Sequence, residues 1–397
     1  MNFGFTAQQE AFAGEVRAFL RANPPENFPE DGMDAGYGSG PHSHAFLRAL
    51  GARGWISMSW PEVWGGQGRP MIDKLILLEE LAAGGAPFGP LSGCDQVADA
   101  IITYGSDTLR RELLPRIARG EATFSQGFSE RDAGSDLLSL KTAARREGDH
   151  YVVNGHKIWS SHAGISDYGL VLARTDPSAP RHRGLSMLVV DNRLPGMDVR
   201  PIRNMTGKVY HYEVFLDAVR VPCDYLLGAE NEGFTQLLKG LDTDRFWGRF
   251  YKAPAMRRIL GELVDYANHT SVGGVPLARD PTIRRRLAQV ATDIAALRML
   301  FYRSGWMIER GIPVTAESPL GKVMADETGQ KLMTLGMEML GRYGLLQEGS
   351  RWARLGGRLQ HLYQTSWSHT IAGGTSEILR TTVATRGLRL PADRSRG

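Results

Sequence analysis

The spacing of apolar residues changes twice along this 397-residue chain, and those changes constrain its fold more than any other sequence feature. Up to about residue 120, apolar residues recur at helical spacing. Between 121 and 232 the pattern becomes a series of short β-rich runs separated by Pro, Gly and Asp turns. Beyond Gly233 long helical patterns return. The sequence therefore predicts an α+β protein with a helical domain at 1–120, a central β domain at 121–232 and a second helical domain at 233–397.

Each domain has its own expected elements. In the first, Thr6 and Gln9 have the spacing of a capping box that opens an amphipathic helix over 6–20. In the central domain, strands are expected at 170–173, 185–190 and 212–216. The last domain contains four long helical patterns, which suit a four-helix bundle able to bury area against other subunits. These patterns cover 234–253, 255–269, 281–310 and 320–343.

Composition argues against several classes of protein. The chain has 42% hydrophobic and 23% charged residues, as globular proteins do, and its net charge of +4 comes from Lys and Arg interspersed with acids. Nucleic acid is therefore not an expected partner. Cys94 and Cys223 are far apart, so neither a disulfide framework nor a metal site is expected. No run of about 20 apolar residues indicates a membrane helix, and we expect a cytoplasmic protein that does not bind membranes.

Two segments of the central domain carry the residues most suited to chemistry. Residues 124–136 read Phe-Ser-Gln-Gly-Phe-Ser-Glu-Arg-Asp-Ala-Gly-Ser-Asp, which interleaves hydroxyls, small residues and backbone donors with two aromatic rings. This composition suits a planar cofactor that bears phosphate. Residues 151–161 alternate apolar and polar residues, and Asn154-Gly155 is expected to form a hairpin turn. Alone, this second segment would equally fit an ordinary strand, turn and strand with a core Trp.

Together the two segments resemble the flavin-binding signature of the acyl-CoA dehydrogenase family. That family usually has Thr-Glu-Pro-x-x-Gly-Ser-Asp in the first segment, and residues 129–136 match it with Ser for Thr and Arg for Pro. Residues 61–68 resemble the family's Pro-Glu-x-x-Gly-Gly-x-Gly landmark, and 217–234 resemble its exit from the β domain. The resemblance spans nearly the whole chain. It implies a tetramer whose subunits have an N-terminal helical domain, a central β-barrel-like domain and a C-terminal four-helix bundle.

The resemblance also implies FAD as the cofactor and assigns residues to it. It places the indole of Trp159 over one face of the flavin and the Ser161 hydroxyl near flavin N5, the atom that accepts hydride. Ser135 would lie between the cofactor phosphates and acyl-CoA. The other positions that the resemblance assigns to the cofactor are Gln126, Phe128, Ser129, Ser160, Thr375 and Glu377.

The catalytic base departs from the family's usual pattern. Oxidation of an acyl thioester needs a base for the α-proton, a hydride acceptor and hydrogen-bond donors at the thioester oxygen. Many members use a Glu in a C-terminal loop, but here that position is Gly373, which retains only its backbone N–H for the oxyanion. A minority branch carries its base in Leu-Asp-x-Glu-Arg, and residues 241–245 match with Asp244 as the carboxylate. Without the resemblance, Asp244 would be interpreted as a surface residue paired with Arg245. With it, Asp244 is the expected base, and the expected acyl-CoA contacts are Ser135, Asp242, Arg245 and Gly374.

Two further departures concern the assembly. The family usually lends an Arg from an Arg-x-x-Phe-Gly segment of a neighbouring subunit to the flavin pyrophosphate, but residues 270–274 read Thr-Ser-Val-Gly-Gly. Glu338 also stands where a Gln is usual. Both changes remove contacts that a homotetramer would supply to itself, so we expect either a homotetramer or a heterotetramer with a related chain. Heteromers and glycine-loop members of this family tend to act on bulky acyl-CoAs such as steroid side chains.

Three functions remain open on these residues. The first is an FAD enzyme that introduces an α,β double bond into an acyl-CoA and passes electrons to an electron-transfer flavoprotein. The second is an oxidase or flavin monooxygenase of the same fold, because an Asp base also serves in nitroalkane oxidation within this superfamily. The third is a catalytically degenerate subunit that completes another chain's site, for which the sequence support is Gly373, Thr270 and Glu338.

Overall fold

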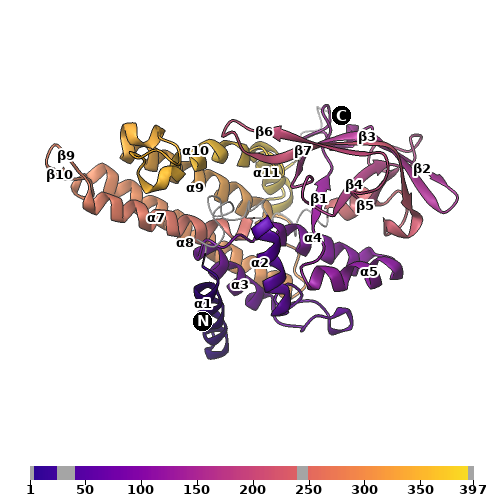
Figure 1. The fold of residues 1–397 in the computed structure, drawn as a ribbon, viewed down its shortest axis with the longest axis horizontal. Helices are drawn as coiled ribbons and strands as arrows, with labels where there is room; N and C mark the ends of the chain where they lie inside the picture. Colours follow the sequence, from indigo (N-terminus) through magenta and orange to yellow (C-terminus); the bar gives the residue numbers. More distant parts are fainter. Residues whose placement is uncertain (1–3, 25–40, 239–248, 392–397) are drawn as a thin grey trace.

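The computed structural model describes residues 4–24, 41–238 and 249–391, and its elements follow the predicted order of helices, strands and helices. Thr6 and Gln9 form the predicted capping box, in which each side chain accepts the other residue's backbone N–H. Figure 1 shows the β domain at one end of the molecule, the C-terminal helices at the other, and the N-terminal helices packed along both. The N-terminal helices are α1 (Ala7–Ala22), α2 (Pro41–Ala52), α3 (Met71–Ala83), α4 (Gly89–Tyr104) and α5 (Asp107–Ala118).

In the described parts of the chain, eight strands form one sheet. Its order is β6-β7-β3-β2-β4-β5-β8, and β1 pairs in parallel with β4. The long strands β3 and β7 are antiparallel, and their register sets residues 160–161 beside 211–212. The strands are β1 (Phe124–Gly127), β2 (Ala143–Glu147), β3 (His150–Ser161), β4 (Tyr168–Arg174), β5 (Leu185–Asp191), β6 (Met197–Arg203), β7 (Val209–Pro222) and β8 (Leu226–Leu227).

Strands β4 and β5 are apolar on both faces because each face meets a different core. Leu170 and Leu172 of β4 pack with the helices in the main hydrophobic core. Val171 and Ala173 point to the opposite side and pack in a smaller core inside the β domain. Burial on both faces explains why the sequence shows continuous apolar runs there and no alternation with polar residues. The sheet is thus anchored to the helical domains through one of its faces.

The predicted hairpin turn at Asn154 and Gly155 is wrong, because β3 continues through both residues with a bulge in its pairing to β7. A type I′ turn needs positive φ at both central residues, and neither of these two residues has it. Instead, the Asn154 amide oxygen accepts the N–H of Ala218 at 2.8 Å. A Cβ on Gly155 would lie 2.2 Å from Thr142 Oγ1. The glycine therefore allows close packing within the sheet. The chain turns instead at Gly148, between β2 and β3, where φ is +65°.

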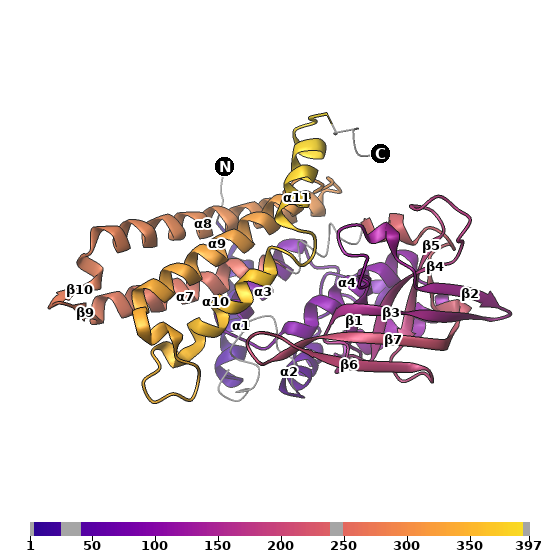
Figure 2. The same ribbon diagram turned by 90° about the horizontal axis from the view of Figure 1, so that it is seen from above.

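The C-terminal domain consists of long helices that run side by side, with the β9–β10 hairpin at their far end (Figure 2). The predictions for 255–269 and 281–310 agree with α7 and α8 to within three residues at each end. The predicted helix over 320–343 instead ends at Leu340, because Gly341 takes φ +54° and ψ −133°. The helices and hairpin strands are α7 (Lys252–His269), β9 (Ser271–Val272), β10 (Val275–Pro276), α8 (Pro281–Glu309), α9 (Glu317–Leu340), α10 (Arg358–His369) and α11 (Ser376–Thr382).

The helix predicted over 234–253 is seen only at its ends. Residues 233–238 and 249–250 are helical, and 239–248 lie outside the described residues. Helices α10 and α11 are additional to the predicted ones. α10 is short and mostly polar, and its apolar residues Leu359 and Leu362 give only a weak periodic signal.

A buried carboxylate joins the N-terminal helices to the C-terminal ones. Glu79 of α3 accepts hydrogen bonds from Arg298 Nε at 2.8 Å and from Tyr302 Oη at 2.6 Å, both on α8. Because the carboxylate is almost fully buried, losing Arg298 would leave its charge, among the described residues, with only the more distant Arg257, 3.7 Å away. The helical domains therefore form one body against which the β domain rests.

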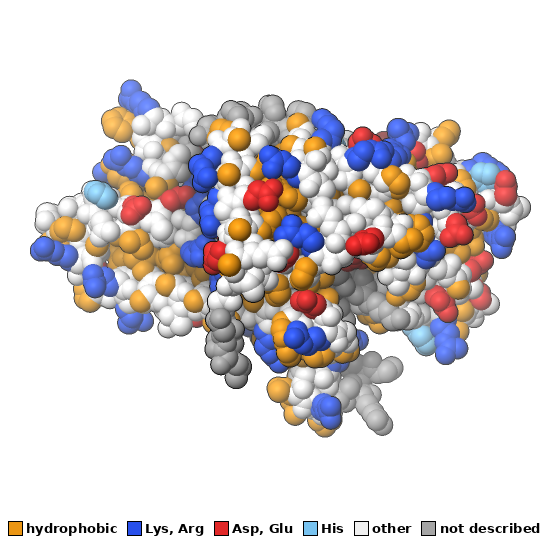
Figure 3. Space-filling view, turned by 90° about the horizontal axis from the view of Figure 1, so that it is seen from below, with side chains coloured by type: hydrophobic (Ala, Val, Ile, Leu, Met, Phe, Trp, Pro, Cys, Tyr) orange, Lys and Arg blue, Asp and Glu red, His pale blue; other side chains and the backbone are white. Residues whose placement is uncertain are grey.

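The two ends of the molecule have different surfaces. Figure 3 shows apolar side chains gathered over the helical end of the lower face and charges of both signs over the β-domain end. Exposed apolar side chains on the bundle helices include Val264, Met299 and Trp306. None of the helices that the structure describes is long and apolar enough to cross a lipid bilayer.

Candidate functional site

The residues after β1 lie against β3, which fixes their backbone. Ile158 donates its N–H to the carbonyl of Ser129 at 3.0 Å, and Lys157 Nζ donates to the carbonyl of Phe128 at 3.1 Å. The Gln126 amide donates to the amide oxygen of Gln96 on α4. Three of the residues predicted to contact the cofactor therefore lie together on one rigid wall.

A buried ion pair supports this wall from behind. The Lys157 side chain is fully buried, and its Nζ lies 2.9 Å from Glu130 Oε1. Glu130 also accepts the backbone N–H groups of Lys141 at 2.6 Å and Thr142 at 2.8 Å. Burial lowers the pKa of Lys157 to about 8, although Glu130 opposes the shift. Burial alone would raise the pKa of Glu130, but Lys157 and the hydrogen bonds lower it. The pair ties 128–130 to β3 and to the segment that leads into β2.

Strand β3 ends in an irregular segment that presents Trp159 to solvent. Trp159 has a φ of +62°, uncommon for a residue with a large side chain, and its side chain is 57% exposed. Its only ring neighbour in the described structure is His211 of β7, whose ring centroid is 6.1 Å away at 81°. Ser160 is 1% exposed, and its hydroxyl has no hydrogen-bond partner among the described residues. The half-buried Ser161 follows it. The predicted flavin-facing residues thus include an uncovered indole and an unsatisfied hydroxyl.

Ser135 lies on an exposed turn next to this wall. Glu130 and Ala133 exchange backbone hydrogen bonds at 3.0 and 3.1 Å, which closes the turn. Ser135 itself is exposed, and the following Asp136 pairs with Arg181 at 2.5 Å. The position leaves the Ser135 hydroxyl accessible to a ligand.

The second group of predicted residues lies on the loop between α10 and α11. Gly373 and Gly374 have φ values of +68° and +93°, which glycine adopts without strain. Thr375 caps α11 by accepting the N–H of Ile378 at 3.2 Å. A hydrogen bond from its own backbone and one from Thr375 lower the pKa of the exposed Glu377. Gly373 is exposed, and a Cβ there would lie 3.4 Å from Arg249 Nη2.

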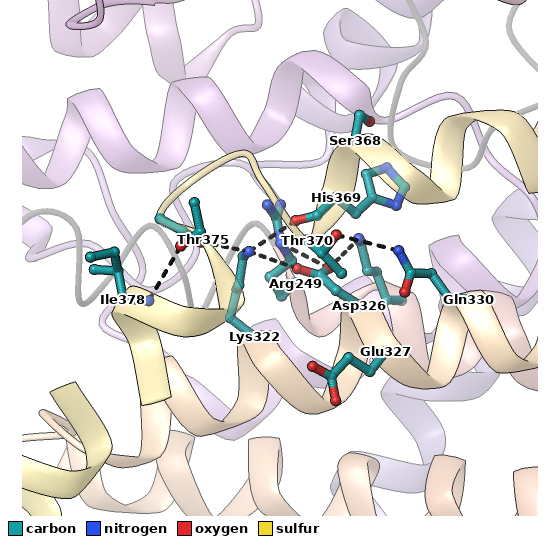
Figure 4. Close-up of polar contacts among 12 residues, drawn as sticks. Arg249, Lys322, Asp326, Glu327, Gln330, Ser368, His369, Thr370, Thr375 and Ile378 are labelled. Atoms are coloured by element: carbon teal, nitrogen blue, oxygen red, sulfur yellow. Dashed lines mark hydrogen bonds and ion pairs between the residues drawn. The ribbon is translucent and has the colours of Figure 1, made fainter. Parts of the chain in front are cut away.

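A cluster of buried charges holds this loop in place (Figure 4). Lys322 Nζ donates to the carbonyls of His369 at 2.9 Å and Gly374 at 2.8 Å. The same ammonium lies 2.9 Å from Asp326, which also pairs with Lys252 at 2.6 Å and Arg249 at 3.5 Å. The loop is therefore hydrogen-bonded to charges on α9.

Electrostatics within this cluster follow from burial and from the excess of cations. Burial would raise the pKa of Asp326, but Lys252, Arg249 and Lys322 together lower it. Burial lowers the pKa of Lys252 to about 8 and that of His369 well below its ordinary range. His369 is therefore neutral at pH 7, and the described side chains here comprise three cations and one carboxylate.

The structure does not describe every predicted site residue. Asp242, Asp244 and Arg245 lie in 239–248, outside the described residues. The remaining predicted residues form two groups, one on β3, β1 and the turn that follows β1, and one on the loop before α11 and the first turn of that helix. Near them, Tyr210 Oη of β7 lies 3.2 Å from His361 Nε2 of α10, so the β domain and the bundle are in contact.

Sequence reasoning missed a cavity between α4, the sheet and the helix that contains 233–238. Polar side chains on one face of α4 line it, namely Gln96, Asp99 and Thr103, and Gln236 faces them. Phe128 also lines it, so the cavity adjoins the wall. The signal that could have revealed the cavity is the spacing of these three polar residues, at i, i+3 and i+7 of a largely apolar helix. The rest of the lining is Ala100, Tyr104, Leu170, Met187, Leu227 and Leu237.

The two positions predicted to alter the assembly have local roles in this chain. Thr270 is the C-cap of α7 and leads into the β9–β10 hairpin, whose turn is Gly273-Gly274 with φ values of +58° and +81°. Such a glycine pair is typical of a type I′ hairpin turn. Glu338 forms an ion pair with Arg286 of α8 on the surface. Their effect on subunit contacts stays a prediction.

Comparisons with known proteins cover nearly the whole chain. Three family models match: acyl-CoA dehydrogenase N-terminal domain at 6–121, middle domain at 125–219 and C-terminal domain at 231–388. The chain is 33% identical to acyl-CoA dehydrogenase FadE26 of Mycobacterium tuberculosis, over 98% of this chain and 99% of that protein. Among solved structures, the Tcur3481–Tcur3483 steroid ACAD has a TM-score of 0.90 at 30% identity, covering 99% of this chain and 100% of that one. The ChsE4–ChsE5 complex from M. tuberculosis has a TM-score of 0.85 at 31% identity, with coverage of 99% and 100%.

Proposed function

Because this chain belongs to the acyl-CoA dehydrogenase family and is an oxidoreductase acting on CH–CH groups, we propose that it introduces an α,β double bond into a bulky acyl-CoA with FAD as cofactor. The observation that carries the proposal is the surface that Phe128 and Ser129 of the wall form together with Trp159 and Ser160 at the end of β3. It offers an exposed indole and a buried hydroxyl to which no described residue forms a hydrogen bond.

The residues present fit FAD. Members of the family are flavoproteins, and the exposed Trp159 ring suits a planar ring system, since aromatic faces gain most from stacking. Ser160 Oγ is a buried donor that a ligand oxygen or nitrogen would satisfy. Gln126, Phe128, Ser129, Ser135 and Ser161 would complete this side, and Thr375 with Glu377 would meet it from α11. FAD, when bound, supplies the acceptor for the β-hydride.

Asp244 is the proposed base for the α-proton. Gly373 has no side chain, so the usual C-terminal-loop carboxylate is absent from this chain. An Asp side chain reaches about 1.5 Å less far than a Glu. The space that Gly373 leaves allows a wide acyl group to approach the shorter base. Burial beside such a group would raise the pKa of Asp244 and strengthen it as a base, whereas Arg245 would oppose that rise.

The chain's own groups would also bind and orient the thioester. The Gly373 backbone N–H is the proposed donor to the thioester oxygen, where negative charge develops as the α-proton leaves. Asp242, Arg245, Ser135 and Gly374 are the proposed contacts to acyl-CoA. Lys322 would keep this loop in place, because it binds the Gly374 carbonyl and is itself held by Asp326.

We propose that bulky acyl groups such as steroid side chains are the substrates and that an electron-transfer flavoprotein accepts the electrons. The similarity to a protein named a steroid ACAD supports the first point. Assembly with a related chain is proposed because Thr270 and Glu338 replace the usual intersubunit contacts and because one similar structure is a ChsE4–ChsE5 complex. The exposed apolar side chains of the bundle would be covered in either a homotetramer or a heterotetramer.

Anaerobic bleaching of the bound flavin tests the function. The protein, purified from its native host with any partner in native stoichiometry, is mixed with straight, branched, aromatic and steroid acyl-CoAs. We expect the bulky substrates to bleach the flavin fastest and an electron-transfer flavoprotein to restore its colour. Rapid reoxidation by oxygen would indicate an oxidase instead. A single chain that stays colourless with FAD, and a complex that no acyl-CoA bleaches, would refute the proposal.

The substitution Asp244→Asn tests the base, because it keeps size and hydrogen bonding while removing basicity. We expect flavin and substrate to bind but bleaching to slow by roughly 10²- to 10⁴-fold. Asp265→Asn, an exposed position on α7, is the matched control and should bleach at the wild-type rate. Wild-type bleaching in Asp244→Asn would show that the base is another residue or belongs to another subunit.

A further inference from the structure

The cavity beside Phe128 contains a buried amide without a protein partner. Gln236 is 5% exposed and lines the cavity, and neither its Oε1 nor its Nε2 has a hydrogen-bond partner in the described structure. Burying an amide without hydrogen bonds is unfavourable, and native proteins largely avoid it. A group that enters the cavity and bonds this amide would remove that cost.

Two other polar side chains of the cavity already form hydrogen bonds within the protein. Thr103 donates its hydroxyl to the carbonyl of Asp99 at 2.7 Å, within α4. Gln96 accepts a hydrogen bond from Gln126. Gln236 differs from these two residues, since neither its donor nor its acceptor is used by the described residues and both remain for a ligand.

The backbone around Gln236 also restricts where its amide can lie. Gly228 has a φ of +66° and donates its N–H to the carbonyl of Tyr104 at 2.8 Å. A Cβ at Gly228 would lie only 2.1 Å from Gln236 Nε2, so the amide occupies the space that the glycine leaves. The amide is thus held in place, as recognition of a single polar group requires.

The lining of the cavity indicates which part of a ligand would enter. Apart from Gln236 and the α4 residues it is apolar, with Phe128, Leu170, Met187 and Leu227 among its walls. Among the residues that the structure describes, its lining includes no Lys or Arg. This mostly apolar lining, with one neutral amide that can donate and accept, suits a hydrocarbon skeleton that carries one neutral oxygen.

We propose that Gln236 determines substrate specificity by binding a hydroxyl or carbonyl group on the acyl chain of the acyl-CoA. The inference rests on the proposed function and narrows its substrate class to acyl groups that carry a neutral oxygen away from the thioester. A purely hydrocarbon chain would leave the amide unsatisfied, and a site built to bond an oxygen discriminates strongly against analogues that lack it.

The test compares pairs of substrates that differ by one oxygen. Straight acyl-CoAs from hexanoyl to dodecanoyl and cyclohexylbutanoyl-CoA are each paired with a hydroxylated counterpart, and kcat/KM is measured for anaerobic flavin reduction. The wild type should prefer the hydroxylated member of at least one pair by roughly 10-fold or more. Gln236→Met, which keeps the length but removes both hydrogen-bonding atoms, should abolish that preference and retain reaction with the unsubstituted member.

Two further measurements separate recognition from a structural role. Because Gln236→Met removes an unsatisfied amide, the apoprotein's melting temperature should hold or rise rather than fall. Gln289→Met, the same substitution at an exposed position on α8, should keep the wild-type preference.

Three results would overturn the inference. The first is a wild type that prefers no hydroxylated substrate. The second is a Gln236→Met variant that slows both members of a pair equally, which would place the contact on the CoA portion. The third is a variant that melts lower and retains the preference. If no acyl-CoA bleaches the flavin at all, the proposed function fails and the inference fails with it.

Discussion

The ion pair between Lys157 and Glu130 allows a quantitative test of how the cofactor wall is held. Lys157→Met keeps most of the buried side-chain volume but removes the ammonium that bonds Glu130 and the carbonyl of Phe128. The Glu130 side chain is only 10% exposed, so its charge would remain buried without its cation. Breaking such a pair by removing one partner typically costs about 3–5 kcal/mol. Because Glu130 keeps two backbone donors, we expect a loss near the lower value.

The double substitution Glu130→Gln with Lys157→Met removes both charges and should cost less than Lys157→Met alone. Replacing a buried pair by neutral groups of similar volume is often close to neutral, so we expect a loss of about 1–2 kcal/mol for the double variant. The assay is denaturant unfolding of the apoprotein, followed by fluorescence and circular dichroism. Flavin affinity is titrated in parallel, since the wall carries Phe128 and Ser129.

Two outcomes would refute this reasoning. A Lys157→Met variant within about 0.5 kcal/mol of wild type would show that the pair contributes little. The Glu130→Gln single variant completes the cycle, and a double variant whose loss equals the sum of the losses of the two single variants would show that the two charges are not coupled.

Three other perturbations have expected outcomes. Trp159→Ala should change the free energy of unfolding of the apoprotein by no more than about 0.5 kcal/mol, because the ring is 57% exposed. It should nevertheless weaken flavin retention and change the flavin spectrum. Unchanged flavin binding would contradict the placement of Trp159 against the flavin. Gly373→Ala should lower the free energy of unfolding by about 1–2 kcal/mol, because φ at this residue is +68°. It should slow flavin reduction by bulky acyl-CoAs more than by short ones. Equal slowing with both kinds of substrate would argue against the steric role. His369 should make the folded state less stable in acid, because burial lowers its pKa in the folded state and the unfolded chain binds the proton first. Neutral His369 stabilises the folded state fully above the pKa of histidine in the unfolded chain, about 6.5. Below that pH the free energy of unfolding falls by up to about 1.4 kcal/mol per pH unit, so His369→Asn should make stability depend less on pH between 7 and 5.

The features that the sequence predicted well depend on local patterns. The capping box at Thr6 and the long helices α7 and α8 follow from residue spacing within one element, and the structure confirms them. The family resemblance rests on short motifs at 61–68 and 129–136, and the matches to three family models confirm it.

The features that were mispredicted or missed depend on contacts distant in sequence. Asn154-Gly155 has the composition of a turn, but the glycine is needed for packing against Thr142, which directly precedes the neighbouring strand β2. The pairing of Lys157 with Glu130 brings together residues 27 positions apart. Gln236 is ordinary in a helical pattern, and only the fold shows that its amide lies in a cavity where no described residue bonds it. Periodicity carries no information about such neighbours.

The charge cluster below Gly373 suggests a physical reason for the placement of the proposed base on another helix. A Glu at position 373 would begin 3.4 Å from Arg249 Nη2 at its Cβ. A guanidinium this close would lower the pKa of the carboxylate and weaken it as a base. Asp326 forms ion pairs with Lys322, Lys252 and Arg249, and one carboxylate compensates only part of the positive charge of three cations. A loop that offers only a backbone N–H above these cations is better suited to stabilising negative charge on a thioester oxygen than to removing a proton. Under the proposed mechanism, proton removal and oxyanion stabilisation therefore belong to different elements of this chain.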